Sequence, residues 1–124
     1  MSRKVNPKTA AKRLQDASKL RPRLAIVLGS GFHRATHALE ADATVPYSML
    51  PGFIRSGVTG HRGEALIGLI DGVPVLVLNG RSHYYEGHSL AEITFPIRVL
   101  AEYGVESVLL TNAAGGIIAN FILA

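Results

Sequence analysis

The sequence has no cysteine and no tryptophan, and charged and aromatic residues are scarce in it. Its 124 residues are 18% charged, 6% aromatic and 48% hydrophobic, and 13 of them are glycine. The absence of cysteine excludes disulfide scaffolds, thiolate nucleophiles and cysteine-based zinc sites. The composition excludes a disordered or fibrous chain, and no apolar run approaches the roughly 18 residues of a membrane-spanning helix. We therefore expect one folded α/β domain, with a cytoplasmic location as the default.

Acidic residues are almost missing from the first 23 residues, where most of the basic ones gather. This segment has eight basic residues against Asp16 alone, a net charge of +7, whereas residues 24–124 have a net charge of −3. Three interpretations stay open: a solvated surface helix, an organelle-targeting presequence, or a contact with a nucleic-acid backbone. The segment has no aromatic residue, which argues against nucleic acid. We expect a basic helical segment over 1–23, followed by a domain over 24–124.

Hydrophobic periodicity and turn residues predict the order of the elements. Asn6-Pro7 is a typical helix start, Asp71-Gly72 is a strong hairpin signal, and Ser89 to Glu92 has the spacing of a capping box. Pro96 lies inside the last helix and is expected to bend it or to loosen its first turn. The expected elements are a helix over 8–20, a strand over 24–28, a short helix over 32–40, an irregular segment over 42–62, paired strands over 65–70 and 73–78, a helix over 89–103 and a strand over 107–110.

Three of the apolar strands run into small, polar loops that contain glycine. These are VLGSG (27–31), VLNGRSH (77–83) and LLTNAAGG (109–116). In open α/β sheets ligands bind beyond the strand ends, and backbone N–H groups in glycine-rich turns attract anions. Arg81 adds a fixed cation and His83 a titratable donor. The pattern predicts a site for a small anion such as phosphate.

Each of these features also has a simpler interpretation. Gly29-Ser30-Gly31 lacks the lysine of a P-loop, and Arg34 stands where a dinucleotide fingerprint has its third glycine. Arg81 and His83 alone would be read as surface residues, and His61 alone as structural or solvated. Tyr85 provides a wall for a sugar or is an ordinary half-buried tyrosine. No pair of histidines, or of a histidine and a carboxylate, at positions i and i+4 makes a convincing metal site, so no metal is expected.

The ordered motifs resemble the N-terminal half of purine nucleoside phosphorylases of the trimeric type. They are LGSG (28–31), PGF (51–53), GHRG (60–63), NGRSHYYEG (79–87), TFPIRVL (94–100) and TNAAGG (111–116), and the resemblance covers roughly residues 20–121. It implies a three-layer α/β fold around a mixed, partly barrel-like sheet. It also implies a pentosyltransferase of purine salvage that converts a purine nucleoside and phosphate into a purine base and a pentose 1-phosphate. No metal or organic cofactor takes part, and the full-length form is expected to be a homotrimer.

The resemblance also assigns roles to single residues. It implies that phosphate is held by Ser30, Arg81, His83 and the backbone N–H of Ala113, with His61 at the mouth of the site near the phosphate. Glu86 is implied to orient His83 and Tyr85 to contact the ribose, while Ala114 and Gly115 line the purine pocket. His83, His61 and Glu86 are thereby the expected catalytic residues.

The chain departs from this family in its length. It ends at Ala124, a few residues past TNAAGG, at roughly half the usual length. The resemblance places the carboxylate and amide that bind the purine, a further serine on the phosphate, and a methionine and a histidine near the ribose in the half that is absent. We therefore expect weak or no activity from these 124 residues alone. Two alternatives stay open: a non-catalytic phosphate-binding or interaction fragment, and a relative of methylthioadenosine phosphorylase.

Overall fold

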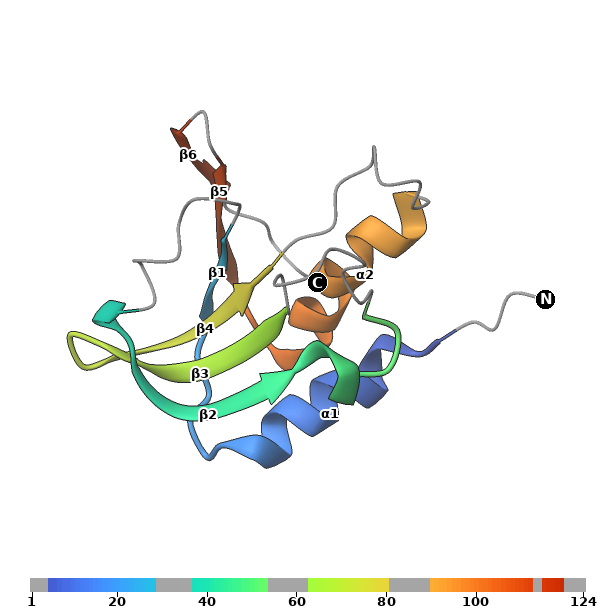
Figure 1. The fold of residues 1–124 in the computed structure, drawn as a ribbon, viewed down its shortest axis with the longest axis horizontal. Coiled ribbons are helices and arrows are strands. Elements are labelled where there is room, and N and C mark those ends of the chain that lie inside the picture. Colours follow the sequence, from blue (N-terminus) through green and yellow to red (C-terminus); the bar gives the residue numbers. More distant parts are fainter. Residues whose placement is uncertain (1–4, 29–36, 54–62, 81–89, 113–114, 120–124) are drawn as a thin grey trace.

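The structure is a computed structural model that describes residues 5–28, 37–53, 63–80, 90–112 and 115–119. These residues form two α-helices, a short 3-10 helix after the second strand, and six strands in one sheet (Figure 1). The elements are α1 (Pro7–Ala17), β1 (Leu24–Leu28), β2 (Glu40–Pro46), η2 (Tyr47–Met49), β3 (Glu64–Ile70), β4 (Val73–Asn79), α2 (Leu90–Tyr103), β5 (Ser107–Asn112) and β6 (Gly115–Ala119). The mixed sheet and its helices confirm the α/β class.

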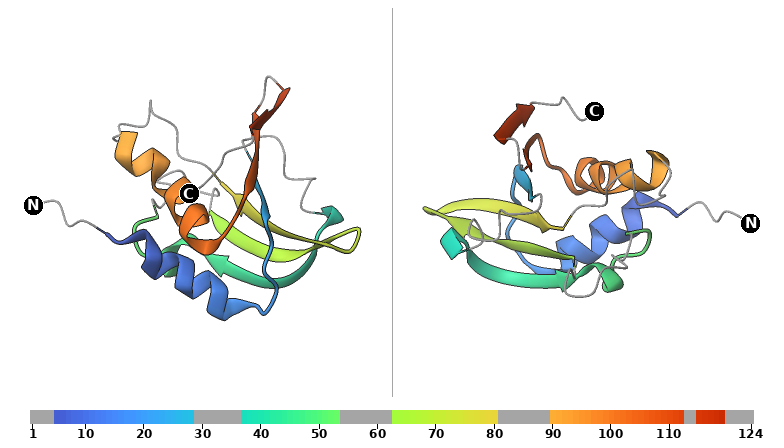
Figure 2. Two further views of the ribbon diagram at one scale, coloured as in Figure 1. Left: turned by 180° about the vertical axis from the view of Figure 1, so that it is seen from behind. Right: turned by 45° about the horizontal axis from the view of Figure 1, so that its top comes forward.

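The strand order in the sheet is β2-β3-β4-β1-β5-β6. The central strands β4, β1 and β5 run parallel, while β2, β3 and β4 form an antiparallel meander and β6 pairs antiparallel with β5. The strands β2 and β3 are strongly curved, yet the sheet stays open, with β2 and β6 at its two edges (Figure 2). Helix α2 connects β4 to β5, two strands separated in the sheet by β1.

Both helices belong to one hydrophobic core on one face of the sheet. Side chains from α1, α2, the four strands β1, β3, β4 and β5, and the segment after β2 meet there. The core residues are Ala10, Ala11, Leu14, Ala25, Val27, Tyr47, Leu50, Phe53, Ala65, Ile67, Leu76, Leu78, Phe95, Val99, Leu100, Tyr103, Val105 and Val108. The described residues therefore show the sheet and one helical layer. On the opposite face, Leu28, Val75 and Val77 form a second, smaller cluster.

Helix α1 begins where the sequence predicts and ends three residues earlier than predicted. The side chain of Asn6 caps it by accepting a hydrogen bond of 2.9 Å from the backbone N–H of Lys8. At its end Ser18 is extended, and its hydroxyl accepts from the backbone N–H of Leu20 and donates to the carboxylate of Asp42. Local side-chain bonds of this kind compete with helical ones, which explains the early end.

Strand β1 and the hairpin of β3 and β4 confirm the prediction. In the turn between β3 and β4, Asp71 has φ of 50° and Gly72 has φ of 79°. Two consecutive positive φ values define the turn whose twist matches that of the flanking strands, and Asp-Gly is among its preferred sequences. This turn fixes the register in which Glu64 lies opposite Asn79.

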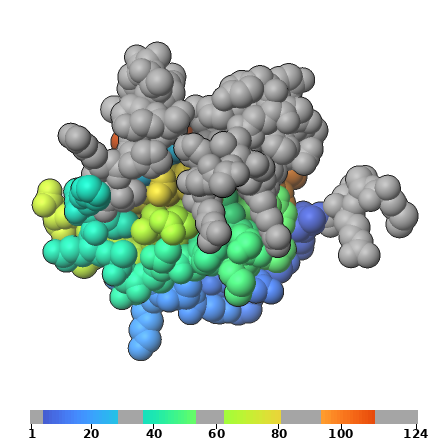
Figure 3. Space-filling view, viewed as in Figure 1, coloured from blue at the N-terminus to red at the C-terminus, as the bar shows by residue number. Residues whose placement is uncertain are grey.

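Two predictions for the region between residues 32 and 62 are wrong in part. Residues 40–46 form strand β2 and residues 47–49 form η2, where the sequence indicated an irregular segment, and the described end of the predicted helix over 32–40 has only a 3-10 turn near His37. Strand β2 is an edge strand whose residues are all exposed or half-buried. Figure 3 shows β2, coloured teal, on the surface above α1. Such a strand is held by backbone pairing with β3. Because its side chains are not buried, they need not follow an apolar pattern that would predict a strand.

The last glycine-rich segment, residues 111–116, was predicted only to end the preceding strand, and the structure differs from this prediction. Strand β5 extends to Asn112, and residues 115–119 return as β6, with Thr111 opposite Gly116 and Asn112 opposite Gly115. At this point the sequence has turn residues but no alternation that predicts a strand. In Figure 1 the hairpin of β5 and β6 stands at one edge of the molecule.

Helix α2 ends at a glycine in the left-handed conformation, as predicted. Gly104 has φ of +113°, and the backbone N–H of Val105 donates to the carbonyl of Leu100 at 3.0 Å, which is the pattern of a Schellman cap. The helix runs through Pro96 without interruption.

We predict that Gly104→Ala lowers the free energy of unfolding by about 1 kcal/mol, because left-handed backbone costs a residue with a Cβ about that much. The space around Gly104 is open, so backbone strain is the only cost. Urea unfolding measures the change. An unchanged midpoint would show that the cap does not limit α2.

Candidate functional site

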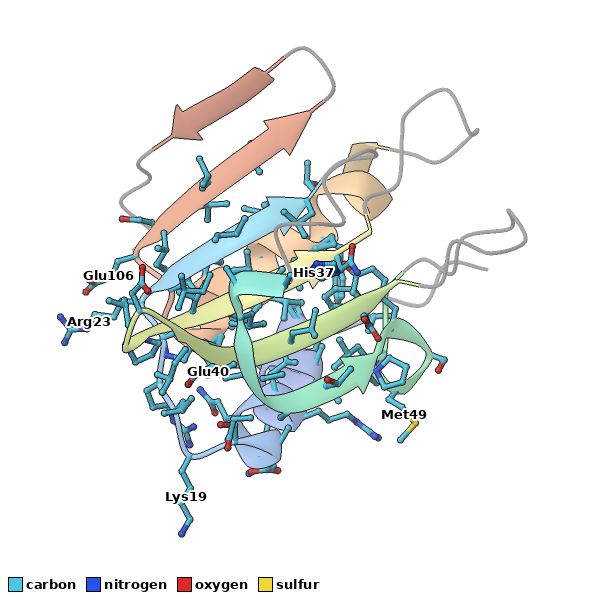
Figure 4. All side chains as sticks on the ribbon, turned by 60° about the vertical axis from the view of Figure 1, so that its left-hand side comes forward. Lys19, Arg23, His37, Glu40, Met49 and Glu106 are labelled. Atoms are coloured by element: carbon cyan, nitrogen blue, oxygen red, sulfur yellow. The ribbon has the colours of Figure 1, made fainter. Side chains whose placement is uncertain are left out.

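The three strands that carry the predicted loops lie side by side and end at the same edge of the sheet. Strand β1 lies between β4 and β5, and all three run parallel. Leu28, at the end of β1, pairs with Asn79, at the end of β4, and Val27 pairs with Leu110 near the end of β5. The arrowheads of these strands point the same way in Figure 4. The segments after β1, β4 and β5 therefore begin next to one another, as the sequence pattern requires.

A fourth segment reaches the same edge from the opposite direction. Strand β3 is antiparallel to β4, and its first residue, Glu64, pairs with Asn79. The segment that contains His61 therefore joins the sheet beside the end of β4. Strand β2 ends here too, because Pro46 pairs with Glu64. We call this boundary, where β1, β4 and β5 end and β3 begins, the loop edge.

Most of the predicted site residues lie outside the described residues. This applies to Ser30, His61, Arg81, His83, Tyr85, Glu86, Ala113 and Ala114, whose assigned roles stay predictions. The structure describes the backbone of Gly115, which begins β6 and pairs with Asn112 at the loop edge. The strands thus bring the attachment points of the predicted residues together.

Tyr47 lies at the loop edge, and the sequence analysis did not single it out. Its side chain is 8% exposed, and its hydroxyl donates a hydrogen bond of 2.6 Å to the carbonyl of Gly80. Its backbone N–H donates to the carbonyl of Gly63 at 3.0 Å. Burial, and secondarily the negative charge of Glu64, raise the pKa of Tyr47 above its usual range. Tyr47 lies in a segment that was expected to be irregular. Both of its hydrogen-bond acceptors are backbone carbonyls, so no residue type in the sequence indicates the contact.

The opposite edge of the sheet has charged residues that are solvated. Arg23, just before β1, lies 3.8 Å from Glu106, just before β5, with side chains 80% and 64% exposed (Figure 4). Ion pairs this exposed contribute little to stability. In α1 the only described ion pair is Lys12 with Asp16, also exposed. Since the apolar side of α1 packs in the core, these observations favour the solvated surface helix for the basic segment.

Neither described helix combines the length and the apolar composition needed to cross a membrane.

Comparison with known families supplies an independent observation. The sequence model of the phosphorylase superfamily matches residues 23–121. The chain belongs to the phosphorylase superfamily. The matched range holds all four segments at the loop edge and every predicted site residue, whereas nearly all of the basic segment lies before it.

Several members of the superfamily are similar to this chain over most of its length. Purine nucleoside phosphorylase 1 of Geobacillus stearothermophilus is 41% identical over 112 residues, which cover 90% of this chain and 41% of the relative. Purine nucleoside phosphorylase of Mus musculus is 42% identical, covering 91% of this chain and 39% of the relative. That of Saccharomyces cerevisiae is 48% identical over 105 residues. The chain spans about two fifths of the length of the curated relatives it matches.

Solved structures of the superfamily share the fold. A purine nucleoside phosphorylase crystallised with ribose-1-phosphate has a TM-score of 0.80 and 34% identity, over 87% of this chain and 40% of that one. The Schistosoma mansoni purine nucleoside phosphorylase with inosine has a TM-score of 0.77 and 34% identity, over 86% of this chain and 37% of that one. The observed sheet is therefore the family's sheet, in part.

Proposed function

We propose that this chain forms the phosphate-binding part of a purine nucleoside phosphorylase. The whole enzyme transfers the pentose of a purine nucleoside to inorganic phosphate, giving a purine base and a pentose 1-phosphate. The observation that carries the proposal is the common end of β4, β1 and β5, joined there by the start of β3. This arrangement lets four loops that are distant in sequence contribute to one anion site.

Phosphate is bound by groups from three of these loops. Ser30 follows β1 and offers a hydroxyl, Arg81 and His83 follow β4, and Ala113 follows β5 and offers a backbone N–H. The Arg81 guanidinium is a rigid fork that matches two phosphate oxygens. Glu86 orients His83, and His61 borders the phosphate from the segment before β3.

The nucleoside lies next to this phosphate. Tyr85 contacts the ribose, and Ala114 and Gly115 line the purine pocket. As the base departs, positive charge develops on the sugar, and the bound phosphate dianion stabilises it. Fixing phosphate against the anomeric carbon also makes the attack effectively intramolecular. These two effects require the phosphate to be held rigidly at the loop edge.

The proposal includes the setting of the enzyme. No metal or organic cofactor is part of the proposal, as the resemblance to the family implies. The whole enzyme is a homotrimer in the cytoplasm, with phosphate and a purine nucleoside as its binding partners. Nucleic acid is not among them, which agrees with the lack of aromatic residues in the basic segment over 1–23.

A hybrid enzyme tests the proposed function. Residues 1–121 of this chain replace the matched segment of the Geobacillus stearothermophilus relative, which supplies the remaining three fifths of a purine nucleoside phosphorylase. Inosine, guanosine and methylthioadenosine are supplied with and without phosphate, and base release is measured after thermal melting has shown that the hybrid is folded. Phosphate-dependent release of hypoxanthine and guanine is expected. A folded hybrid that releases neither would contradict the proposal.

A second candidate function is a phosphate-binding fragment without catalysis. The two candidates differ in one measurement. An enzyme part confers turnover on the hybrid, whereas a mere binding fragment retains phosphate binding and gives no turnover in any context.

A further inference from the structure

We infer that Tyr47 is a positioning residue for the anion site: it ties the loop that follows β4 to the loop that precedes β3. For its effect on phosphate the inference rests on the proposed function, while the tie itself is a property of described residues alone. Neither Gly63 nor Gly80 touches substrate in this account. They are the described residues nearest in sequence to His61 and Arg81, and Tyr47 contacts both of these glycines.

The tie has two hydrogen bonds from a single residue. Tyr47 follows β2 directly, and its backbone N–H continues the β2–β3 pairing by donating to the carbonyl of Gly63 at 3.0 Å. Its side chain then passes beyond β3, and the hydroxyl donates to the carbonyl of Gly80 at 2.6 Å. Because β3 lies between β2 and β4 in the sheet, Tyr47 spans three strands at the loop edge.

Both partners of Tyr47 are glycines, and the geometry requires this. A Cβ on Gly63 would overlap the ring of Tyr47. Gly80 has φ of +120°, in the region that L side chains rarely adopt, and a Cβ there would lie 3.0 Å from the Cα of Gly63. The ring and the two glycine backbones are therefore in close contact, which leaves little freedom in the direction that the chain takes after Gly80.

The ring of Tyr47 packs against other aromatic residues. Its centroid lies 4.8 Å from that of Phe53, and Phe53 lies 6.1 Å from Phe95 of α2, edge to face. The carbonyl of Tyr47 also accepts from the backbone N–H of Leu50 at 2.9 Å. The hydroxyl is thus aimed by packing that reaches the core, so that it is a fixed donor.

The protonation state supports this role. Burial raises the pKa of Tyr47 above its usual range, so the hydroxyl keeps its proton through the whole pH range in which such an enzyme works. A carbonyl can only accept, and Tyr47 can only donate to it. Consequently the bond to Gly80 does not depend on pH.

The consequence concerns Arg81, which is covalently next to Gly80. A guanidinium that must contact two phosphate oxygens tolerates little displacement. Loss of the hydrogen bond to the Gly80 carbonyl is therefore expected to lower the fraction of molecules in which Arg81 is positioned to bind phosphate. A net hydrogen bond of ordinary strength corresponds to about three- to tenfold in an equilibrium constant. We expect a weakening of phosphate binding of that size when the hydroxyl is removed.

The test compares Tyr47→Phe with Tyr103→Phe in the 124-residue chain. Tyr103 is a matched control, because it is 5% exposed and its hydroxyl also donates to a backbone carbonyl, that of Leu20 at 3.1 Å. Leu20 precedes β1, so this bond lies at the opposite edge of the sheet from Gly80. Each variant loses the hydrogen bond from its hydroxyl to a backbone carbonyl and keeps its ring. Tyr103→Phe also removes the contact of that hydroxyl with Arg21, which precedes β1 as Leu20 does. Two quantities are measured: amide hydrogen exchange without phosphate, and the dissociation constant of inorganic phosphate by calorimetry.

In Tyr47→Phe we expect faster exchange in peptides over 61–64 and 79–84, and phosphate binding about three- to tenfold weaker. In Tyr103→Phe both quantities should equal those of the parent chain. If exchange is equal in Tyr47→Phe and in the parent chain, Tyr47 does not tie the two loops together, whether or not the parent chain binds phosphate. If the parent binds phosphate and Tyr47→Phe binds it equally well, the positioning role is wrong while the proposed function stands. A parent chain that binds no phosphate would contradict the proposed function, and exchange alone would then decide on the tie.

Discussion

A polypeptide of residues 1–124 alone is expected to phosphorolyse inosine at least about 1,000-fold more slowly than the hybrid enzyme, because it lacks the groups that stabilise the departing base. Losing even one transition-state donor typically costs about 100- to 1,000-fold in turnover. The chain spans 41% of the Geobacillus stearothermophilus relative, and the resemblance places the purine-binding carboxylate and amide in the remainder. Phosphate held at the loop edge supplies only part of the differential binding that accelerates the reaction.

The measurement is hypoxanthine release at equal concentrations of the two proteins and at saturating phosphate. Hybrid enzyme without phosphate serves as the control for hydrolysis. Turnover by the 124-residue chain within about tenfold of the hybrid would contradict the division of the site into a phosphate part and a base part.

Arg81→Ala in the hybrid enzyme is expected to weaken the use of phosphate at least about tenfold. Of the proposed phosphate ligands Arg81 alone has a permanent charge, and hydrogen bonds that involve ionised partners contribute about 1.5–3 kcal/mol each. One decade in an equilibrium constant corresponds to about 1.4 kcal/mol. Initial rates at varied phosphate concentration and fixed inosine give the effect as a change in kcat/KM for phosphate.

Two further measurements make the Arg81 result specific. Arg81→Lys should recover only part of the loss, because an ammonium is a point charge without the fork of a guanidinium. The KM for inosine should change much less than that for phosphate. If Arg81→Ala left kcat/KM for phosphate unchanged, the assignment of Arg81 to the anion would be wrong.

The elements that could be predicted from the sequence are those whose own side chains determine them. Residues 24–28 are apolar throughout because β1 packs on both faces of the sheet, against the main core on one face and the second cluster on the other. Asp71 and Gly72 adopt positive φ values that few other residue pairs adopt easily, so these two residues alone predicted the hairpin. The apolar strands β1, β4 and β5 each run into a glycine-containing loop, which predicted that the three loops lie close together. The pairing of Leu28 with Asn79 agrees with this prediction.

The remainder depends on partners that a single segment does not reveal. Strand β2 is exposed or half-buried throughout and exists because β3 offers an unpaired edge. Strand β6 consists partly of glycines and exists because β5 does. Tyr47 was overlooked for the same reason, since its role comes from carbonyls that lie 16 and 33 residues further along the chain. Aromatic residues with a polar tip in segments read as irregular are where such contacts should be sought.

Amide hydrogen exchange with and without phosphate shows whether phosphate binds where β4, β1 and β5 end together. The 124-residue chain is compared in phosphate and in sodium chloride of matched ionic strength. Phosphate is expected to slow exchange in peptides that cover 29–31, 80–84 and 111–115, and to leave those over 18–23 and 104–107, at the opposite edge, unchanged. Arg81→Ala should remove the protection. Protection at the opposite edge or on α1 instead, or equal exchange in the two salts, would mean that phosphate does not bind at the loop edge.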